Sequence, residues 1–262
     1  MPDPSPKTPK TFLALDLGNT NLGCAVFQGE RLAHRLIVPV VDITARPEAW
    51  LASFPAQILS TVDVSLLSSV NPPAADLVLA SLSRVLGKSP LLLGSDVPVP
   101  VKARVDYPDE VGTDRLLNVL AAFRRCSHAC FIVDLGTALT IDVCDPDGAY
   151  LGGIIAPGLG VSASALHDHT ALLPKVHVAR PKAVTGRNTL DCIRSGLFWG
   201  SVSMIEGLVL RLRTEHPEAR KVFATGGGAA LIASACPVID EVLPDLHFEG
   251  LRIAAQSAGL LS

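Results

Sequence analysis

One short phrase occurs twice in this chain, each time directly after a run of apolar residues. The first copy is "LDLGNTN", from Leu15 to Asn21, and the second is "VDLGTALTID", from Val133 to Asp142. Glycine in a tight turn lets the backbone approach a ligand closely, and its exposed N–H groups can bind a phosphate. Asp-x-Gly and Asn-Thr are also common hairpin residues, which would explain either copy alone. Two copies favour a duplicated fold with one phosphate-binding turn in each half.

The residues that follow the two copies alternate in the same order. After each phrase the pattern predicts a three-stranded antiparallel meander, and then helices that alternate with single strands. In the first half we expect strands at 11–16, 22–28, 31–38, 64–69 and 89–93, with helices at 47–60 and 73–86. In the second half we expect strands at 130–135, 138–145, 149–156, 221–224 and 238–242, with helices at 158–168, 188–214, 227–235 and 248–260.

These patterns predict an α/β fold of two duplicated lobes, each a mixed sheet opened by a meander. We expect a flexible N-terminal tail at 1–10, a first lobe at 11–125 and a second lobe at 126–262. A helix near 112–126 would end the first lobe and link it to the second. If the two turns face each other across a cleft, they can bind one polyphosphate from both sides.

Composition excludes several classes of partner. Hydrophobic residues make up 48% of the chain, yet no apolar run reaches the roughly 18 residues of a membrane span. The net charge of −3 gives no attraction to nucleic acid or anionic lipid. The proline-rich start lacks a secretory signal, and the six cysteines show no metal or redox spacing. We therefore expect a cytoplasmic protein with free thiols and a small-molecule substrate, bound to neither membrane nor nucleic acid.

A third glycine-rich turn is "TGGGAALI", from Thr225 to Ile232, where a strand ends and a helix begins. The backbone at Gly226 and Gly227 could lie close to a flat base or a sugar, beside the helix N-terminus. Such turns are common in α/β folds, so this one is weak evidence by itself.

Six segments in order carry a resemblance to a known family. They are "DLGNTN", "PDEVGTDRLLNVLAA", "DLGTALTID", "GGIIAPGL", "GRNTLDCIRSGLFWG" and "ATGGG". The chain resembles the superfamily of acetate and sugar kinases, actin and heat-shock ATPases, and within it the type III pantothenate kinases. The resemblance implies actin-like (ribonuclease H-like) lobes with the active site in the cleft between them. It also implies phosphorylation of pantothenate by ATP with Mg²⁺ and a monovalent cation, K⁺ or NH₄⁺, as the first committed step toward coenzyme A.

The same resemblance implies roles for individual residues. Asp134 and Asp16 would hold cations. The residues expected at ATP are Asp16, Leu17, Gly18, Asn19, Thr20, Asn21, Leu22, Gly23, Gly136, Thr137, Gly226 and Gly227. Those expected at pantothenate are Val105, Gly112, Thr113, Asp114, Arg115 and Thr189. Val105 departs from the family pattern, because many members carry a tyrosine seven residues before the glycine, and Tyr107 is out of register.

Asp114 is the candidate general base. A primary alcohol is a poor nucleophile, and a carboxylate that accepts its proton adds roughly 10²- to 10⁴-fold to the rate. An acid in the first turn of a helix also stabilises the helix dipole, and the residues alone do not separate the two roles. The resemblance favours catalysis. Arg115 would bind the substrate carboxylate or steady Asp114.

The helix expected at 188–214 predicts a homodimer. Its apolar residues cover more than one face, whereas a single lobe needs only one stripe. Gly196 and Gly200 beside Phe198 and Trp199 would let two copies pack about a two-fold axis, so that Thr189 reaches the neighbouring active site. A helix buried wholly in its own lobe is the alternative. For function, the alternatives are a kinase of another small alcohol or sugar, and a non-catalytic nucleotide-binding regulator.

Overall fold

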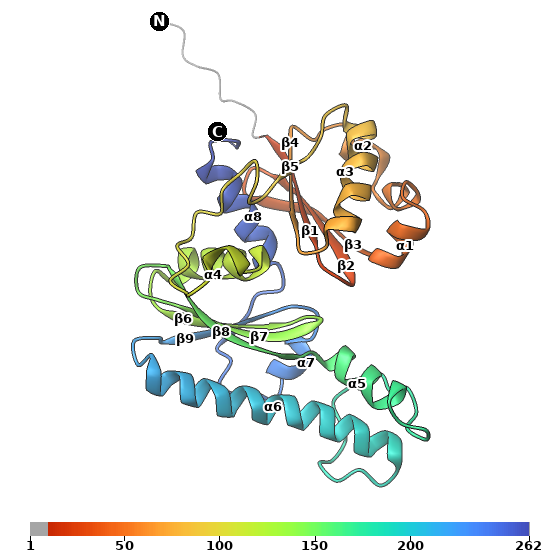
Figure 1. Cartoon of the computed structure of the whole chain (residues 1–262), viewed down its shortest axis with the longest axis vertical. Coiled ribbons are helices and arrows are strands. Elements are labelled where there is room, and N and C mark those ends of the chain that lie inside the picture. Colours follow the sequence, from red (N-terminus) through yellow and green to blue (C-terminus); the bar gives the residue numbers. More distant parts are fainter. Residues whose placement is uncertain (1–9, 262) are drawn as a thin grey trace, which may run out of the picture. The chain divides into compact units, whose positions relative to one another are not determined.

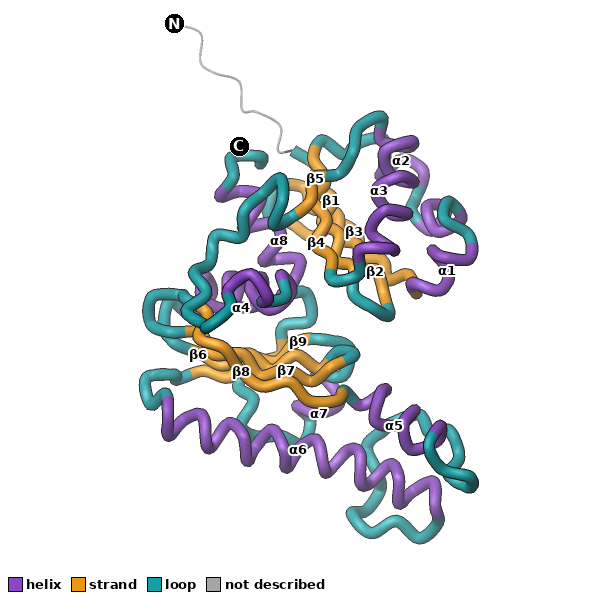
Figure 2. The backbone as a smooth tube through the Cα atoms, viewed as in Figure 1, coloured by secondary structure: helices purple, strands orange, loops and turns teal. Residues whose placement is uncertain are grey.

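The computed structural model describes residues 10–261, which form two compact units (Figures 1 and 2). Unit 1 contains residues 10–100, 110–121 and 247–261, and unit 2 contains residues 101–109 and 122–246. The expected tail at 1–10 falls almost wholly outside the described residues. The predicted division into lobes at 11–125 and 126–262 stays a prediction. Contacts group residues 110–121 and 247–261 with unit 1.

Unit 1 is built on a five-stranded mixed sheet with the order β3-β2-β1-β4-β5. The β1–β2 and β2–β3 pairs are antiparallel, while β4 runs parallel to β1 and to β5. The strands are β1 (Thr11–Leu17), β2 (Asn21–Gln28), β3 (Arg31–Pro39), β4 (Val64–Ser69) and β5 (Leu91–Leu92). The predicted meander is therefore present, and β5 is shorter than the strand expected at 89–93.

One face of this sheet forms the core of unit 1. Alternate residues of β1, such as Leu13 and Leu15, are fully buried and pack with the apolar stripe of α3 (Pro72–Leu86). Asn71 caps α3 by accepting a hydrogen bond from the Ala74 N–H. The remaining helices of this part of the chain are α1 (Val40–Ala45), η1 (Ala49–Ser53), α2 (Ala56–Leu59), η2 (Pro108–Glu110), α4 (Thr113–Cys126) and α8 (Leu246–Ser257).

The single helix expected at 47–60 is wrong. The chain instead forms α1, the 3₁₀ turn η1 and the one-turn helix α2. Pro47 lies just before η1, and Pro55 directly precedes α2. A proline inside a helix lacks the N–H that the backbone ladder needs and clashes with the preceding turn, so a continuous helix cannot include Pro55.

Unit 2 repeats the sheet topology of unit 1. Its order is β10-β9-β6-β7-β8, again with two antiparallel pairs on one side of the first strand and two parallel pairs on the other. The strands are β6 (Cys130–Leu135), β7 (Ala138–Cys144), β8 (Tyr150–Pro157), β9 (Lys221–Thr225) and β10 (Glu241–Val242). β6 corresponds to β1 and β9 to β4, so the duplication predicted from the two Asp-Leu-Gly turns is confirmed.

The long helix α6 (Thr189–Glu215) covers one face of the second sheet (Figure 1). Phe198, Val202, Ile205 and Val209 form a single buried stripe at helical spacing and pack with β6, β7 and β9. The other helices of unit 2 are α5 (Leu159–Asp168) and α7 (Ala229–Ala233). No described helix is long and apolar enough to cross a membrane. All six cysteines are free thiols, as predicted.

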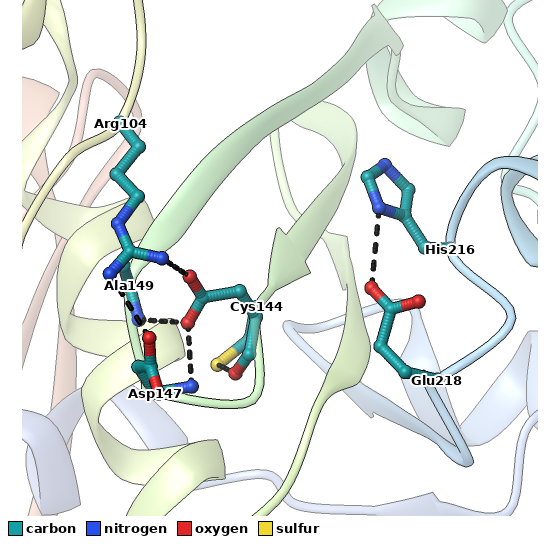
Figure 3. Close-up of polar contacts among 7 residues, drawn as sticks. Arg104, Cys144, Asp147, Ala149, His216 and Glu218 are labelled. Carbon is teal, nitrogen blue, oxygen red and sulfur yellow. Dashed lines mark hydrogen bonds and ion pairs between the residues drawn. The ribbon is translucent and has the colours of Figure 1, made fainter.

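The segment 101–105 adds to the edge of the second sheet. The Tyr150 N–H donates to the Lys102 carbonyl at 2.8 Å, and the Arg104 N–H donates to the Tyr150 carbonyl at 2.8 Å. The Arg104 guanidinium bonds the buried Asp145 carboxylate and, at 3.1 Å, Asp147 (Figure 3). These bonds fix the chain shortly before the "VGTDR" motif.

Candidate active site

The first Asp-Leu-Gly phrase forms the turn between β1 and β2. The Gly18 N–H donates to the Asn21 carbonyl at 3.0 Å, which closes the turn. Asn19 and Thr20 at its tip are exposed, and Asp16 is partly buried at the carboxyl end of β1. The turn therefore presents polar groups beside a carboxylate, as a phosphate site with a bound cation requires.

A cysteine next to this turn has no catalytic character. Cys24 pairs with Leu15 across the β1–β2 ladder and is fully buried. Burial raises the pKa of the Cys24 thiol far above its usual range, and the nearby Asp16 carboxylate raises it further. The thiol is therefore neutral at physiological pH, which excludes a thiolate nucleophile at this place.

The "VGTDR" motif joins the same part of unit 1. Ser68 of β4 pairs with Asp16 of β1 in parallel register, and its buried hydroxyl bonds the Thr113 hydroxyl at 2.9 Å. Thr113 is the first residue of α4, so the structure brings the start of this helix to the carboxyl ends of β1 and β4. In this fold class ligands bind outside the carboxyl ends of parallel strands.

Asp114 lies in the first turn of α4 and is partly exposed. Its Oδ1 accepts a hydrogen bond from the Arg115 N–H at 2.9 Å. A Cβ at Gly112 would lie against this carboxylate, so a larger residue at 112 would displace the Asp114 side chain. Arg115 is partly buried, with its Nη2 atom fully enclosed. The carboxylate is thus oriented by the backbone while it stays accessible to a ligand.

The second Asp-Leu-Gly phrase forms the equivalent turn of unit 2, between β6 and β7. The Gly136 N–H donates to the Ala138 carbonyl at 3.0 Å, which parallels the bond made by Gly18. The Gly158 N–H donates to the Thr137 carbonyl at 3.0 Å, and a side chain at 158 would overlap the carbonyls of this turn. The turn is held in place by the end of β8, while Gly136 and Thr137 remain exposed.

Asp134 precedes this turn and lies against the third glycine-rich segment. Gly226 has a φ of +87°, and a Cβ there would lie 2.7 Å from the carbonyl carbon of Leu135 and closer still to Asp134 Oδ1. Gly227, by contrast, faces open space. Only glycine therefore allows the end of β9 to approach Asp134 as closely as it does.

The oxygen atoms around Asp134 suit a hard cation. Thr140 of β7 and Thr225 of β9 both pair with Asp134, so the three side chains lie on the same face of the sheet. Thr225 Oγ1 is buried and has no hydrogen-bond partner among the described residues. The part of the chain that the structure describes holds no cluster of three or more metal-binding side chains. The Asp134 carboxylate and the two neighbouring hydroxyl side chains supply oxygen donors, which hard cations prefer.

A cavity of about 600 Å³ opens beside the same glycines. It lies between α5, the segment 175–179 and the start of α7, and Gly227 and Gly228 form part of its wall. Its size is within the usual range for a small-molecule site, which is about 300–1,000 Å³. The expectation that this backbone lies close to a ligand is consistent with an open cavity there.

Two expected substrate residues lie elsewhere in the fold. Val105 belongs to unit 2, where it packs near Gly152 of β8, whereas Gly112–Arg115 belong to unit 1. Thr189 is exposed at the first position of α6, directly after the Asn188 cap. The structure thus gathers Gly112–Arg115 with the first turn within unit 1, whereas Val105 and Thr189 belong to unit 2.

Sequence reasoning missed three residues at these turns, namely Ser68, Gly158 and Thr225. Ser68 and Thr225 occupy equivalent places, each beside the aspartate of its own phosphate turn on the neighbouring parallel strand. Thr225 is the last residue of β9 and Ser68 the last but one of β4, two strands that the sequence predicted. The missing information was the strand order, because only parallel pairing with β1 or β6 brings these hydroxyls next to the aspartates.

Known proteins of one family are similar to this chain over most of its length. The profile of the type III pantothenate kinase family matches residues 12–211. A type III pantothenate kinase from Dehalococcoides mccartyi is 39% identical over 94% of this chain and 97% of its own length. Another from Syntrophotalea carbinolica is 37% identical over 92% of this chain and 97% of its own length.

Solved structures share the fold at much lower identity. One is a Campylobacter jejuni protein assigned to a Baf family of transcriptional activators, with a TM-score of 0.60, 19% identity, and coverage of 94% of this chain and 98% of that one. Another is the ethanolamine utilization protein EutJ of Carboxydothermus hydrogenoformans, with a TM-score of 0.53, 14% identity, and coverage of 98% and 92%. These two show the fold alone. The family match over residues 12–211 and the relatives that align over more than 90% of this chain show that it belongs to the type III pantothenate kinase family.

Proposed function

We propose that this chain transfers the γ-phosphoryl group of ATP to the primary hydroxyl of pantothenate, which gives 4′-phosphopantothenate and ADP. The observation that carries the proposal is the family match over residues 12–211, joined to a local geometry that suits the reaction. In unit 1, the hydroxyl bond between Ser68 and Thr113 links the strand beside the first phosphate turn to the helix that carries Asp114. The proposed phosphate-binding turn and the "VGTDR" motif, which would bind the phosphoryl acceptor, therefore lie close together in unit 1.

ATP is bound by the two turns and the late glycines. The residues assigned to it are Asp16 to Gly23, Gly136, Thr137, Gly226 and Gly227. Exposed backbone and short side chains at both turns support phosphate binding. The cavity beside Gly227 and Gly228 would take the nucleoside. Asp16 and Asp134 are the candidates to hold the cations, and Mg²⁺ bound there with the phosphates would neutralise charge during transfer.

Asp114 is the general base in this proposal. As the substrate hydroxyl oxygen bonds to the γ-phosphorus, Asp114 accepts the hydroxyl proton and the bond to the leaving ADP oxygen breaks. Its partly exposed carboxylate, oriented by the Arg115 N–H, supports this role. Arg115 carries the positive charge next to Asp114 and is suited to pair with the pantothenate carboxylate.

Asp134 would hold a monovalent cation, K⁺ or NH₄⁺, beside the ATP phosphates. The support is its oxygen-rich surroundings, with Thr140 and Thr225 on the same face. K⁺ prefers oxygen ligands, which the Asp134 carboxylate and the phosphates would supply.

The active form would be a homodimer in which each substrate site uses Thr189 of the second copy. The support is α6, whose buried stripe faces its own sheet while other apolar residues stay uncovered, with Leu210 68% exposed. Gly196 and Gly200 have open space above them, as close packing of two helices would need.

The deciding experiment is turnover of the purified chain with ATP and Mg²⁺ in the presence of K⁺. Pantothenate, glucose, N-acetylglucosamine and acetate are each offered as acceptor, and the phosphorylated product is identified by mass spectrometry. Phosphorylation of pantothenate alone supports the proposal. Transfer to a sugar or to acetate would favour a different kinase, and ATP binding without any transfer would favour a nucleotide-binding regulator.

A further inference from the structure

Ser68 lies where two functional parts of unit 1 meet. It is the fifth residue of β4 and is only 1% exposed. The parallel register places it directly beside Asp16 of β1, and paired residues of neighbouring strands present their side chains on the same face. The hydroxyl of Ser68 therefore belongs to the layer of atoms that supports the first phosphate turn.

The partner of this hydroxyl is unusual for a buried serine. Another buried serine of unit 1, Ser81, bonds the backbone carbonyls of Pro47 and Leu77. Ser68 instead bonds the side chain of Thr113 at 2.9 Å, across 45 residues of sequence. Side chain–side chain bonds are only about 10–15% of protein hydrogen bonds, because most polar side chains bond the backbone or water.

Thr113 connects this hydrogen bond to the "VGTDR" motif. It is the first residue of α4, and Asp114 follows it in the same turn. The Ser68 hydroxyl is therefore a side-chain contact that ties this first turn of α4 to β4. A shift of Thr113 would move the Asp114 carboxylate relative to Asp16.

We propose that Ser68 is a positioning residue for phosphoryl transfer, which sets the distance between the first phosphate turn and the Asp114 carboxylate through its bond to Thr113. The proposal rests on the proposed function and names a residue that the motifs did not include. In-line transfer depends on alignment, and a misplacement of about 1 Å can cost on the order of 10²-fold in rate. We call the hydrogen bond between the Ser68 and Thr113 hydroxyls the joint. Both side chains are short and have few rotatable bonds, so the joint can hold the two segments at a fixed distance.

The test compares two buried serines of one strand. Ser68→Ala removes the joint, while Ser65→Ala makes the same change three residues earlier, where the side chain is 4% exposed and points to the opposite face. We expect Ser68→Ala to lower kcat about 10-fold with the KM for ATP changed less than about twofold. We expect Ser65→Ala to leave kcat unchanged.

A double-mutant cycle assigns the effect to the bond. Thr113→Val keeps the shape of the side chain and removes its hydroxyl. If the two hydroxyls act as one joint, Ser68→Ala combined with Thr113→Val loses no more kcat than Thr113→Val alone. Equal kcat in Ser68→Ala and Ser65→Ala would overturn the proposal, and so would multiplicative losses in the double variant.

Hydrogen–deuterium exchange separates this proposal from the proposed function. We expect faster exchange of the amides at the start of α4 in Ser68→Ala than in the unaltered protein or Ser65→Ala, whatever acceptor the enzyme uses. Unchanged exchange there would show that Ser68 does not hold the helix. If the unaltered protein does not phosphorylate pantothenate but Ser68→Ala exchanges faster, the proposed function is refuted. The role of the Ser68–Thr113 bond in holding α4 is then still supported.

Discussion

At the scale of single residues, Asp114 and Asp134 differ in the groups that surround their carboxylates. Asp114 is in the first turn of a helix and receives the N–H of Arg115. Asp134 lies near the end of a strand and is flanked by hydroxyl side chains on both neighbouring strands. A base needs one accessible oxygen, whereas a cation site needs several oxygens around one point, so the two environments suit the two proposed roles.

Asp114→Asn should abolish proton acceptance while it keeps the size of the side chain. We expect kcat to fall by about 10²-fold or more, with little change in nucleotide affinity. Steady-state kinetics and nucleotide titration measure the two effects. Asp109→Asn, an exposed acid five residues earlier, is the matched control and should keep full turnover. Turnover of Asp114→Asn equal to that of the control would exclude Asp114 as the base.

Asp134→Asn should remove the dependence of activity on a monovalent cation. In the unaltered enzyme we expect activity to rise with K⁺ or NH₄⁺ at constant ionic strength, because the ion offsets phosphate charge beside Asp134. In the variant we expect most activity to be lost and the remaining activity to be insensitive to K⁺. Asp168→Asn, at the exposed end of α5, controls for loss of charge. Full activity of the unaltered enzyme without either ion would refute this assignment.

At the scale of elements, the close packing of turns against strand ends decides where glycine is required. In unit 2 the β6–β7 turn is contacted by Gly158 from the end of β8, and Asp134 is contacted by Gly226 from the end of β9. The ends of β8 and β9 therefore converge on the β6–β7 turn. Any side chain larger than a hydrogen atom would push them apart.

Gly226→Ala should destabilise this arrangement. Alanine is strained at a φ of +87°, and its Cβ would overlap Asp134 and Leu135. We expect a loss of about 1–3 kcal/mol in the free energy of unfolding and weaker ATP binding. Chemical denaturation and nucleotide titration provide the measurements. Gly227→Ala, where open space receives the methyl group, should leave the free energy of unfolding nearly unchanged. Equal stability of the two variants would show that the close approach is not required.

At the scale of the whole molecule, one sheet topology occurs twice with different surroundings. Both units place an aspartate near the end of the first strand and a buried hydroxyl beside it on the parallel neighbour. In unit 1 that hydroxyl belongs to Ser68 and bonds the Thr113 hydroxyl of the "VGTDR" motif. In unit 2 the corresponding Thr225 Oγ1 has no hydrogen-bond partner within residues 10–261. The two units thus share the same sheet and the same place for the hydroxyl, but they differ in what that hydroxyl contacts.

Gly200→Arg tests the proposed assembly. Gly200 is exposed on α6, and no atom lies within 4 Å of the place where a Cβ would stand, so an arginine fits a single chain and would obstruct a helix of a second copy. We expect weaker association and lower activity together. Light scattering coupled to gel filtration measures the mass at the assay concentration. Thr214→Arg adds the same charge to an exposed position about 21 Å along the helix and should leave both unchanged. A fully active monomer of the unaltered protein would eliminate the shared site.

Most strands and the long helices could be predicted from local patterns. The meanders follow from alternating apolar residues between turn residues, and α6 follows from apolar residues at helical spacing. The helix expected at 47–60 does not form, because Pro55 interrupts a segment whose apolar residues have helical spacing. The short strands β5 and β10 were overestimated, since their length depends on the neighbours they pair with.

By itself, the sequence determined the duplication, the two Asp-Leu-Gly turns and the family, since each depends on residues that are adjacent along the chain. Turn geometry and strand formation are local, so a few neighbouring residues suffice to specify them. Only the tertiary structure decided that Ser68 lies beside Asp16 and bonds Thr113, and that Gly158 and Gly226 close around the second turn. These contacts join segments far apart in the chain, and they depend on the order and register of the strands, which local patterns do not specify.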